Sequence, residues 1–147
     1  MRPPPVRPPL SRRVEIVIAC LVFPLALEIF SAGRVFHAVE SIRPRKKLGR
    51  ISPTAIARYV DALLTRLPGP WRHTCLRRAV VLAALLRREG LRAEVVIGVK
   101  RDASGAVEAH SWVRCNGLEP YLDQNPTTGF VPINQGLPLA WPVGIRD

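Results

Sequence analysis

Cysteines and aromatic residues are scarce in this chain of 147 residues. Its three cysteines, Cys20, Cys75 and Cys115, lie far apart and form no Cys-x-x-Cys pair, which argues against a disulfide framework and favours a reducing compartment. Aromatic residues make up 6%, and neither zinc-finger spacing nor a glycine-rich phosphate loop is present. We therefore expect no nucleic-acid partner, no metal and no cofactor.

Acidic residues are also few, at 11 against 22 lysines and arginines, for a formal charge of +11. This surplus favours an anionic partner, such as an acidic peptide or a membrane surface. Residues 1–50 hold ten basic and three acidic side chains, so the charge is concentrated there. The hydrophobic fraction of 48% is enough for the core of one globular domain.

No hydrophobic run is long enough to cross a membrane. The longest, residues 16–27, has twelve residues and lies between Glu15 and Glu28, whereas a spanning helix needs about 20. The run follows a proline-rich start and precedes no clean cleavage site, so an export signal is not expected. We predict a cytoplasmic protein with two apolar helices interrupted at Pro24, and peripheral membrane contact stays an open alternative.

The chain divides into a 1–50 segment, comprising a Pro/Arg arm, apolar helices and a basic connector, and a 51–147 domain. Ser52-Pro53 is typical of a helix start, and the helix should end before Pro68. A second helix should run from Cys75 to about Glu89 with Thr74 as its cap. Residues 79–86 are apolar on every side, which predicts a central position for this helix.

Three strands are expected after the second helix, at residues 93–99, 107–115 and 118–123. Asn116-Gly117 is a strong hairpin signal. If Asn116-Gly117 is a two-residue loop, each residue before the loop faces a residue after it, and the two residue numbers sum to 233. The facing pairs would then be Arg114 with Glu119, Trp112 with Tyr121, and His110 with Asp123.

This register gives a candidate catalytic site. His110 and Asp123 would have Cβ atoms roughly 5 Å apart, so the carboxylate could orient the imidazole. Cys75, at the first turn of a buried helix, is the candidate nucleophile, because unpaired N–H groups there favour a thiolate. Cys20 and Cys115 are interpreted as structural, and His73 as a rival base or metal ligand. Trp71 is interpreted as a packing residue, with donation of its indole N–H to the oxyanion as the alternative.

The stretch from Trp71 to Asp123 carries a resemblance to a known family. The segments TCLRRAVVLAALLRREGLRAEVVIGV and AHSWVRCNGLEPYLD are similar to the stand-alone leader peptidase of lasso-peptide biosynthesis, a member of the transglutaminase-like cysteine protease superfamily. The helix at 51–67 and the FVPI segment at Phe130 extend the similarity more weakly.

The resemblance implies an α+β, papain-like or transglutaminase-like fold, with the catalytic helix on a small antiparallel sheet and an N-terminal helical extension. It implies a Cys75-His110-Asp123 triad that removes the leader from a ribosomally made lasso-peptide precursor. It also implies a separate small leader-binding protein and a separate ATP-dependent cyclase.

Two other functions stay open. An amine could capture the acyl-enzyme, as in an amide-forming transglutaminase, with Glu108 as the one acid placed to steer the amine. Alternatively, the chain could be a non-catalytic basic adaptor. Residues 1–50 are the expected docking surface for the leader-bound partner or for the cytoplasmic face of a membrane.

Overall fold

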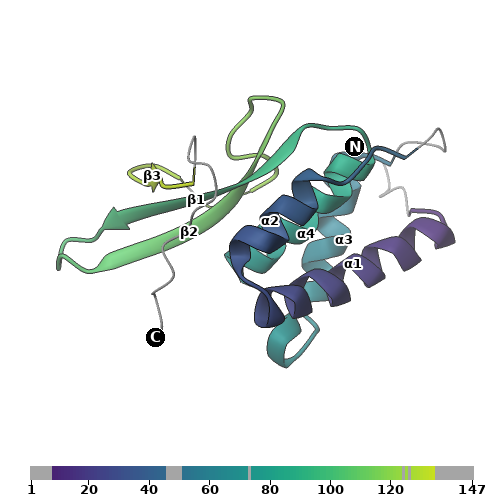
Figure 1. The fold of residues 1–147 in the computed structure, drawn as a ribbon, viewed down its shortest axis with the longest axis horizontal. Coiled ribbons are helices and arrows are strands. Elements are labelled where there is room, and N and C mark those ends of the chain that lie inside the picture. The colour runs from purple at the N-terminus through teal and green to yellow at the C-terminus, as the bar shows by residue number, and fades with distance from the viewer. Residues whose placement is uncertain (1–7, 46–50, 73, 124, 126, 135–147) are drawn as a thin grey trace, which may run out of the picture.

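The structure, a computed structural model, describes residues 8–45, 51–72, 74–123, 125 and 127–134. A layer of helices packs against one end of an antiparallel sheet, whose other end projects into solvent (Figure 1). The predicted α+β class is confirmed, with a helix that begins at Cys75 packed on a small antiparallel sheet and with a helical N-terminal segment.

Two helices come from the N-terminal segment, α1 (Leu10–Ile29) and α2 (Ala32–Glu40). The predicted interruption at Pro24 is wrong, because α1 runs through Pro24 and ends at Phe30, whose backbone is extended. Proline removes one helical hydrogen bond, but Pro24 is buried, as are Ile16, Ala19 and Cys20 on the same side of α1. Burial of this side offsets the lost hydrogen bond.

The next two helices begin and end close to where their caps predict. Helix α3 (Pro53–Leu64) starts with proline in its first turn. A short 3-10 turn, η1 (Gly69–Trp71), leads to α4 (Cys75–Arg88). Thr74 caps α4 by accepting a hydrogen bond from the Arg77 N–H at 3.3 Å. Every residue from Ala79 to Leu86 is buried, so α4 lies in the centre of the helical layer, as predicted.

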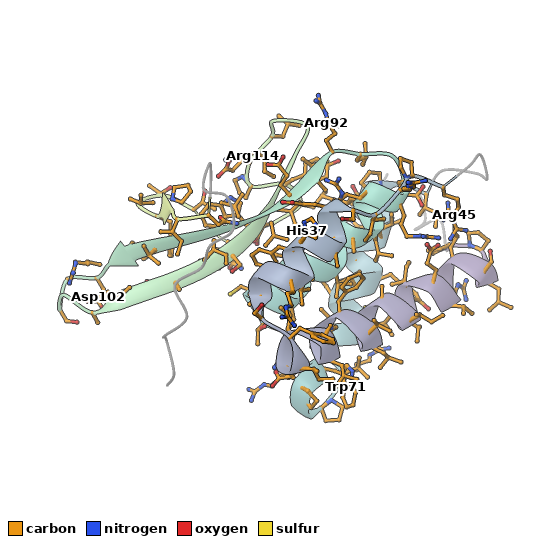
Figure 2. All side chains as sticks on the ribbon, viewed as in Figure 1. His37, Arg45, Trp71, Arg92, Asp102 and Arg114 are labelled. Atoms are coloured by element: carbon orange, nitrogen blue, oxygen red, sulfur yellow. The ribbon has the colours of Figure 1, made fainter. Side chains whose placement is uncertain are left out.

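The sheet has the strand order β2-β1-β3, formed by β1 (Ala93–Arg101), β2 (Val107–Cys115) and β3 (Val131–Pro132). Strands β1 and β2 pair along their whole length, from Ala93 opposite Cys115 to Arg101 opposite Val107. Their exposed turn contains Asp102, at the far tip of the ribbon (Figure 2).

The third strand predicted at 118–123 does not form. Asn116 and Gly117 adopt the left-handed backbone that the turn requires, and Cys115 pairs with Leu118, whose numbers sum to 233 as predicted. Beyond that pair the Tyr121 N–H donates to the carbonyl of Val113. These two residue numbers sum to 234, so the register has shifted by one residue. Pro120 has no N–H to give the ladder, and the segment continues as a loop. Tyr121 therefore lies beside Val113 instead of facing Trp112.

One core joins the helices to the inner face of the sheet. It includes Cys20 of α1, Phe36 of α2, Val60 of α3, Leu82 of α4 and Val113 of β2. The helices before residue 50 thus share a hydrophobic core with those after it.

Candidate active site

Cys75 is the first residue of α4, and its thiol is free and half-buried. The N–H groups of a first helical turn have no partner inside the helix. The Thr74 hydroxyl oxygen accepts a hydrogen bond from the N–H of Arg77. The N–H groups of Cys75 and Leu76, the first two of the helix, have no acceptor within the helix. No acidic residue lies in this turn. The partial positive charge at this helix N-terminus is therefore not offset by an acidic residue of the same turn.

His110 lies on β2 with a side chain that is only 12% exposed. Its ring stacks on Trp112, with centroids 5.8 Å apart, and lies 5.6 Å from the ring of Phe130. The Trp112 indole N–H donates to Glu119 at 2.9 Å, and Glu119 also pairs with Arg114. The ion pair between Arg114 and Glu119 was expected from the hairpin; the indole bond to the same carboxylate was not.

Gly98 makes room for these rings. It pairs with His110 across the β1–β2 ladder. A Cβ at position 98 would lie 2.5 Å from the Cη2 atom of Trp112 and 3.0 Å from the Cβ atom of Phe130. Only glycine therefore allows both aromatic side chains to pack beside His110 as they do.

Asp123 faces His110 from the loop after Tyr121. Its Oδ2 lies 3.5 Å from His110 Nε2, and its side chain is 5% exposed. The other oxygen, Oδ1, accepts the N–H of Asn125 at 3.0 Å, which fixes the carboxylate orientation. Nε2 is buried with no hydrogen-bond donor or acceptor of its own in the described structure, so Asp123 is its charged neighbour. The other ring nitrogen of His110, Nδ1, is then the one that can exchange a proton with a third group.

Arg78 connects the Asp123 loop to the turn that begins with Cys75. Its guanidinium donates to the carbonyl of Leu122, the residue before Asp123, at 2.6 Å. It also forms an ion pair with Asp61 of α3. Arg78 lies three residues after Cys75, on the same first turn of α4. Sequence reasoning missed this contact because it joins residues 44 positions apart.

The other sequence candidates have different surroundings. Cys20 and Cys115 are buried, at 0% and 1% exposure. Burial raises the pKa of Cys115, and burial together with the charge of Asp61 raises the pKa of Cys20 to about 12. Trp71 donates its indole N–H to the carbonyl of Leu21 at 2.8 Å. That N–H is thus already used, and a role for it at the oxyanion is not supported.

The remaining expectations concern metals, membranes and His73. Within the described residues, no group of three His, Cys, Asp or Glu side chains could hold a metal ion. No helix of the described ranges is both long and apolar enough to cross a bilayer. His73, considered above as a rival base or ligand, lies outside the described residues.

Comparison with known proteins supports the fold assignment. The family model of the transglutaminase-like superfamily matches residues 17–135, which includes most of α1 and all later helices and strands. No curated protein and no solved structure matches the chain. The matched range covers more than half of the sequence and contains Cys75, His110 and Asp123. The chain belongs to the transglutaminase-like superfamily.

Proposed function

We propose that the protein is a cysteine peptidase with Cys75 as nucleophile, His110 as general base and Asp123 as the group that orients His110. The main support is the 3.5 Å approach of Asp123 Oδ2 to His110 Nε2. Arg78 ties the same loop to the first turn of α4, and the superfamily contains enzymes that use a cysteine nucleophile.

In the proposed reaction, His110 Nδ1 takes the proton of the Cys75 thiol as the sulfur attacks a peptide carbonyl. The oxyanion is received by the free N–H groups at the start of α4. Collapse of the tetrahedral intermediate breaks the C–N bond, and His110 returns the proton to the leaving amine. Water then attacks the thioester with His110 again as base, which releases a carboxylate and the free thiol.

The substrate we propose is the precursor of a lasso peptide, cut between leader and core. This proposal depends on the resemblance of the segment from Trp71 to Asp123 to stand-alone leader peptidases of lasso-peptide biosynthesis. A separate leader-binding protein would present the precursor, and an ATP-dependent cyclase would use the released core. The net charge of +11 suits a substrate or partner that carries acidic residues.

Hydrolysis is proposed over amide formation. Glu108 was the acid placed to steer an incoming amine, but it is 54% exposed and forms an ion pair with Lys100 at 3.1 Å. A carboxylate that already has a cationic neighbour attracts a second ammonium less strongly.

The test uses peptides encoded by short reading frames next to the gene, with any small adjacent partner, in ¹⁸O-labelled water. We expect two free fragments, with label in the new leader carboxylate. Cys75→Ala and His110→Ala should each lower cleavage by on the order of 10³-fold or more, while Asp123→Asn retains measurable activity because Asp123 orients the base and transfers no proton. Cys115→Ala is the matched control.

Normal turnover by Cys75→Ala would refute the mechanism. An unlabelled cross-linked or cyclic product would instead favour an amide-forming enzyme. No reaction with any peptide, together with an inert Cys75, would favour the non-catalytic adaptor.

A further inference from the structure

One side of α1 exposes a long apolar surface. Nine of the twelve large hydrophobic side chains that are exposed in the described structure belong to α1 or to the residue after it. They recur every three or four positions, so they form one continuous stripe, and we call this set the α1 stripe: Leu10, Val14, Val17, Ile18, Leu21, Val22, Leu25, Ile29 and Phe30. Helix α1 lies at the edge of the helical layer, away from the sheet (Figure 1).

A groove follows the N-terminal half of the α1 stripe. It has a volume of about 540 Å³, and Val14, Ile18 and Val22 line one side while Ile42 and Leu85 contribute to the other. Its charged lining residues are Glu15, Arg45 and Arg88, and the two arginines both form ion pairs with Glu15. The surface is thus apolar and concave, and its charges are already paired.

The composition of the stripe favours a protein surface over a lipid surface as its occupant. Helices that lie in a membrane interface carry lysine and arginine beside their apolar face, with tryptophan or other aromatic anchors. Helix α1 as a whole has only two basic residues, Arg13 and the buried Arg12, and it contains no lysine, tryptophan or tyrosine. Interface cores between proteins are likewise depleted in charged residues.

We propose that the α1 stripe is the interface of a homodimer in which two copies of α1 pack antiparallel around a twofold axis. The stripe runs from residue 10 to residue 30. If the twofold axis passes beside residue 20, each position of one copy faces a position of the other copy, and the two residue numbers sum to 40. Leu10 then lies near Phe30 of the second copy, and Ile18 beside its Val22. Leu25 and Ile29 of the second copy lie over the groove.

The ends of the helix suit this orientation. Arg13 is near the N-terminal end of α1, and Glu28, whose side chain is 49% exposed beside its ion pair with Arg77, is near the other end. Antiparallel packing aligns the two helix dipoles favourably, and it keeps the two copies of Arg13 apart, as it does the two copies of Glu28. A parallel pair would bring like charges together at both ends.

The exposed area is adequate for a dimer. At exposures of 36% to 75%, the nine side chains present on the order of 800 Å² per copy, which is about what one partner contributes to an interface of standard size. Each copy carries a formal charge of +11, so the two repel at long range. Salt screens this repulsion and should strengthen the dimer.

Sedimentation velocity and equilibrium of the full chain test the proposal. We expect a mass of twice 16.3 kDa at tens of micromolar protein, with a dissociation constant that falls as NaCl rises from 50 to 500 mM. Ile18→Glu and Val22→Glu should each raise that constant at least tenfold without changing the far-UV circular dichroism. Val107→Glu, at a residue 64% exposed on the sheet, is the matched control and should leave it unchanged.

Cysteine cross-linking tests the antiparallel register in a Cys75→Ala background. Oxidation of mixed Leu10→Cys and Phe30→Cys copies should give a disulfide-linked dimer, and Leu10→Cys alone should give none. A monomer at all salt concentrations would overturn the proposal. So would cross-linking of Leu10→Cys alone, or a monomer whose stripe binds vesicles of phosphatidylserine and phosphatidylcholine.

Discussion

At the scale of single residues, the three cysteines have the same side chain but lie in two kinds of environment. Cys20 and Cys115 are enclosed by the core, and burial raises the pKa of both thiols, that of Cys20 to about 12. Cys75 is half-buried at a helix start, and the first turn of that helix contains no acidic residue. Position in the fold, and not residue type, therefore selects the candidate nucleophile.

We predict that iodoacetamide at pH 7.5 alkylates Cys75 at least about tenfold faster than Cys20 or Cys115 in the folded protein. The thiolate is the reactive form, and a thiol with a pKa near 12 is almost wholly protonated at this pH. Peptide mapping by mass spectrometry gives the three rates. In urea the three rates should converge, and faster labelling of Cys20 in the native state would contradict the prediction.

At the scale of elements, the packing around His110 depends on one position of the neighbouring strand. Gly98 on β1 leaves space for Trp112 on β2 and for Phe130 before β3. We predict that Gly98→Ala displaces Trp112, destabilises the protein by about 1–3 kcal/mol and lowers cleavage more than Val99→Ala does. Urea unfolding and peptide cleavage measure the two effects.

A second substitution tests whether the clash with Trp112 is the cause. The nearest atoms to a Cβ at position 98 belong to the outer ring of the Trp112 indole, which Trp112→Phe removes. In the double variant, Gly98→Ala should therefore cost less stability than it does in the wild-type background. If the losses of stability caused by Gly98→Ala and Trp112→Phe simply add, the destabilisation by Gly98→Ala has a cause other than the clash with Trp112.

A second link between elements depends on Glu15 of α1. Burial by itself raises the pKa of this carboxyl, but hydrogen bonds from Arg12 and Arg88, with the charges of Arg88 and Arg45, outweigh burial and lower its pKa. Arg88 belongs to α4 and Arg45 to the segment after α2, so the Glu15 carboxylate joins three parts of the chain. This junction lies near one end of α1, and Trp71 lies near the opposite end of the helix (Figure 2).

The lowered pKa of Glu15 predicts a pH dependence of stability. The group is ionised and paired in the folded state to a lower pH than in the unfolded state, so its stabilisation is present above the unfolded pKa, about 4.3. It is lost as pH falls through the folded-state pKa. Glu15→Gln should lower the free energy of unfolding at pH 7 and make it less dependent on pH below about 4.5. Equal slopes for both proteins in acid would refute this assignment.

Local signals in the sequence predicted most elements and two contacts across the hairpin, but not the contacts between segments distant in the sequence. Thr74 and Ser52-Pro53 define two helix starts, and Asn116-Gly117 defines the hairpin and brings Asp123 back toward His110. The loop after Leu118 departed from prediction because Pro120 cannot pair. The bond from Arg78 to Leu122 and the space at Gly98 join residues distant in sequence, so periodicity and turn signals carry no information about them.

At the scale of the whole molecule, the N-terminal helices are part of the folded core that supports the candidate site. Cys20 of α1 and Phe36 of α2 are buried in the same cluster as α3 and α4. Near Cys75, the indole of Trp71 donates to the Leu21 carbonyl of α1, and Arg77 of α4 forms an ion pair with Glu28 of α1. Helix α1 thus holds both the segment before Cys75 and the turn that contains it.

We therefore predict that deletion of residues 1–50 unfolds the remainder, whereas a pure docking segment could be removed without loss of structure. The truncated chain would expose the side chains of α3 and α4 that α1 and α2 cover, at a cost of about 25 cal/mol per Å² of apolar surface, and a domain is stable by only about 5–15 kcal/mol. Dispersion of amide signals in ¹⁵N-resolved NMR spectra should collapse, and activity on a short peptide spanning the cleavage site should disappear with it.

The variant Ile18→Glu/Val22→Glu separates docking from folding in this comparison. Both side chains are exposed, at 53%, so the full-length variant should keep native NMR dispersion and cleave the short peptide at the wild-type rate, even though it alters the outer surface of α1. A truncated chain that keeps both its fold and its short-peptide activity would show that residues 1–50 serve docking alone. Loss of structure in the truncated chain but not in the double variant would establish that the inner side of α1 supports the site while its outer side is free to bind.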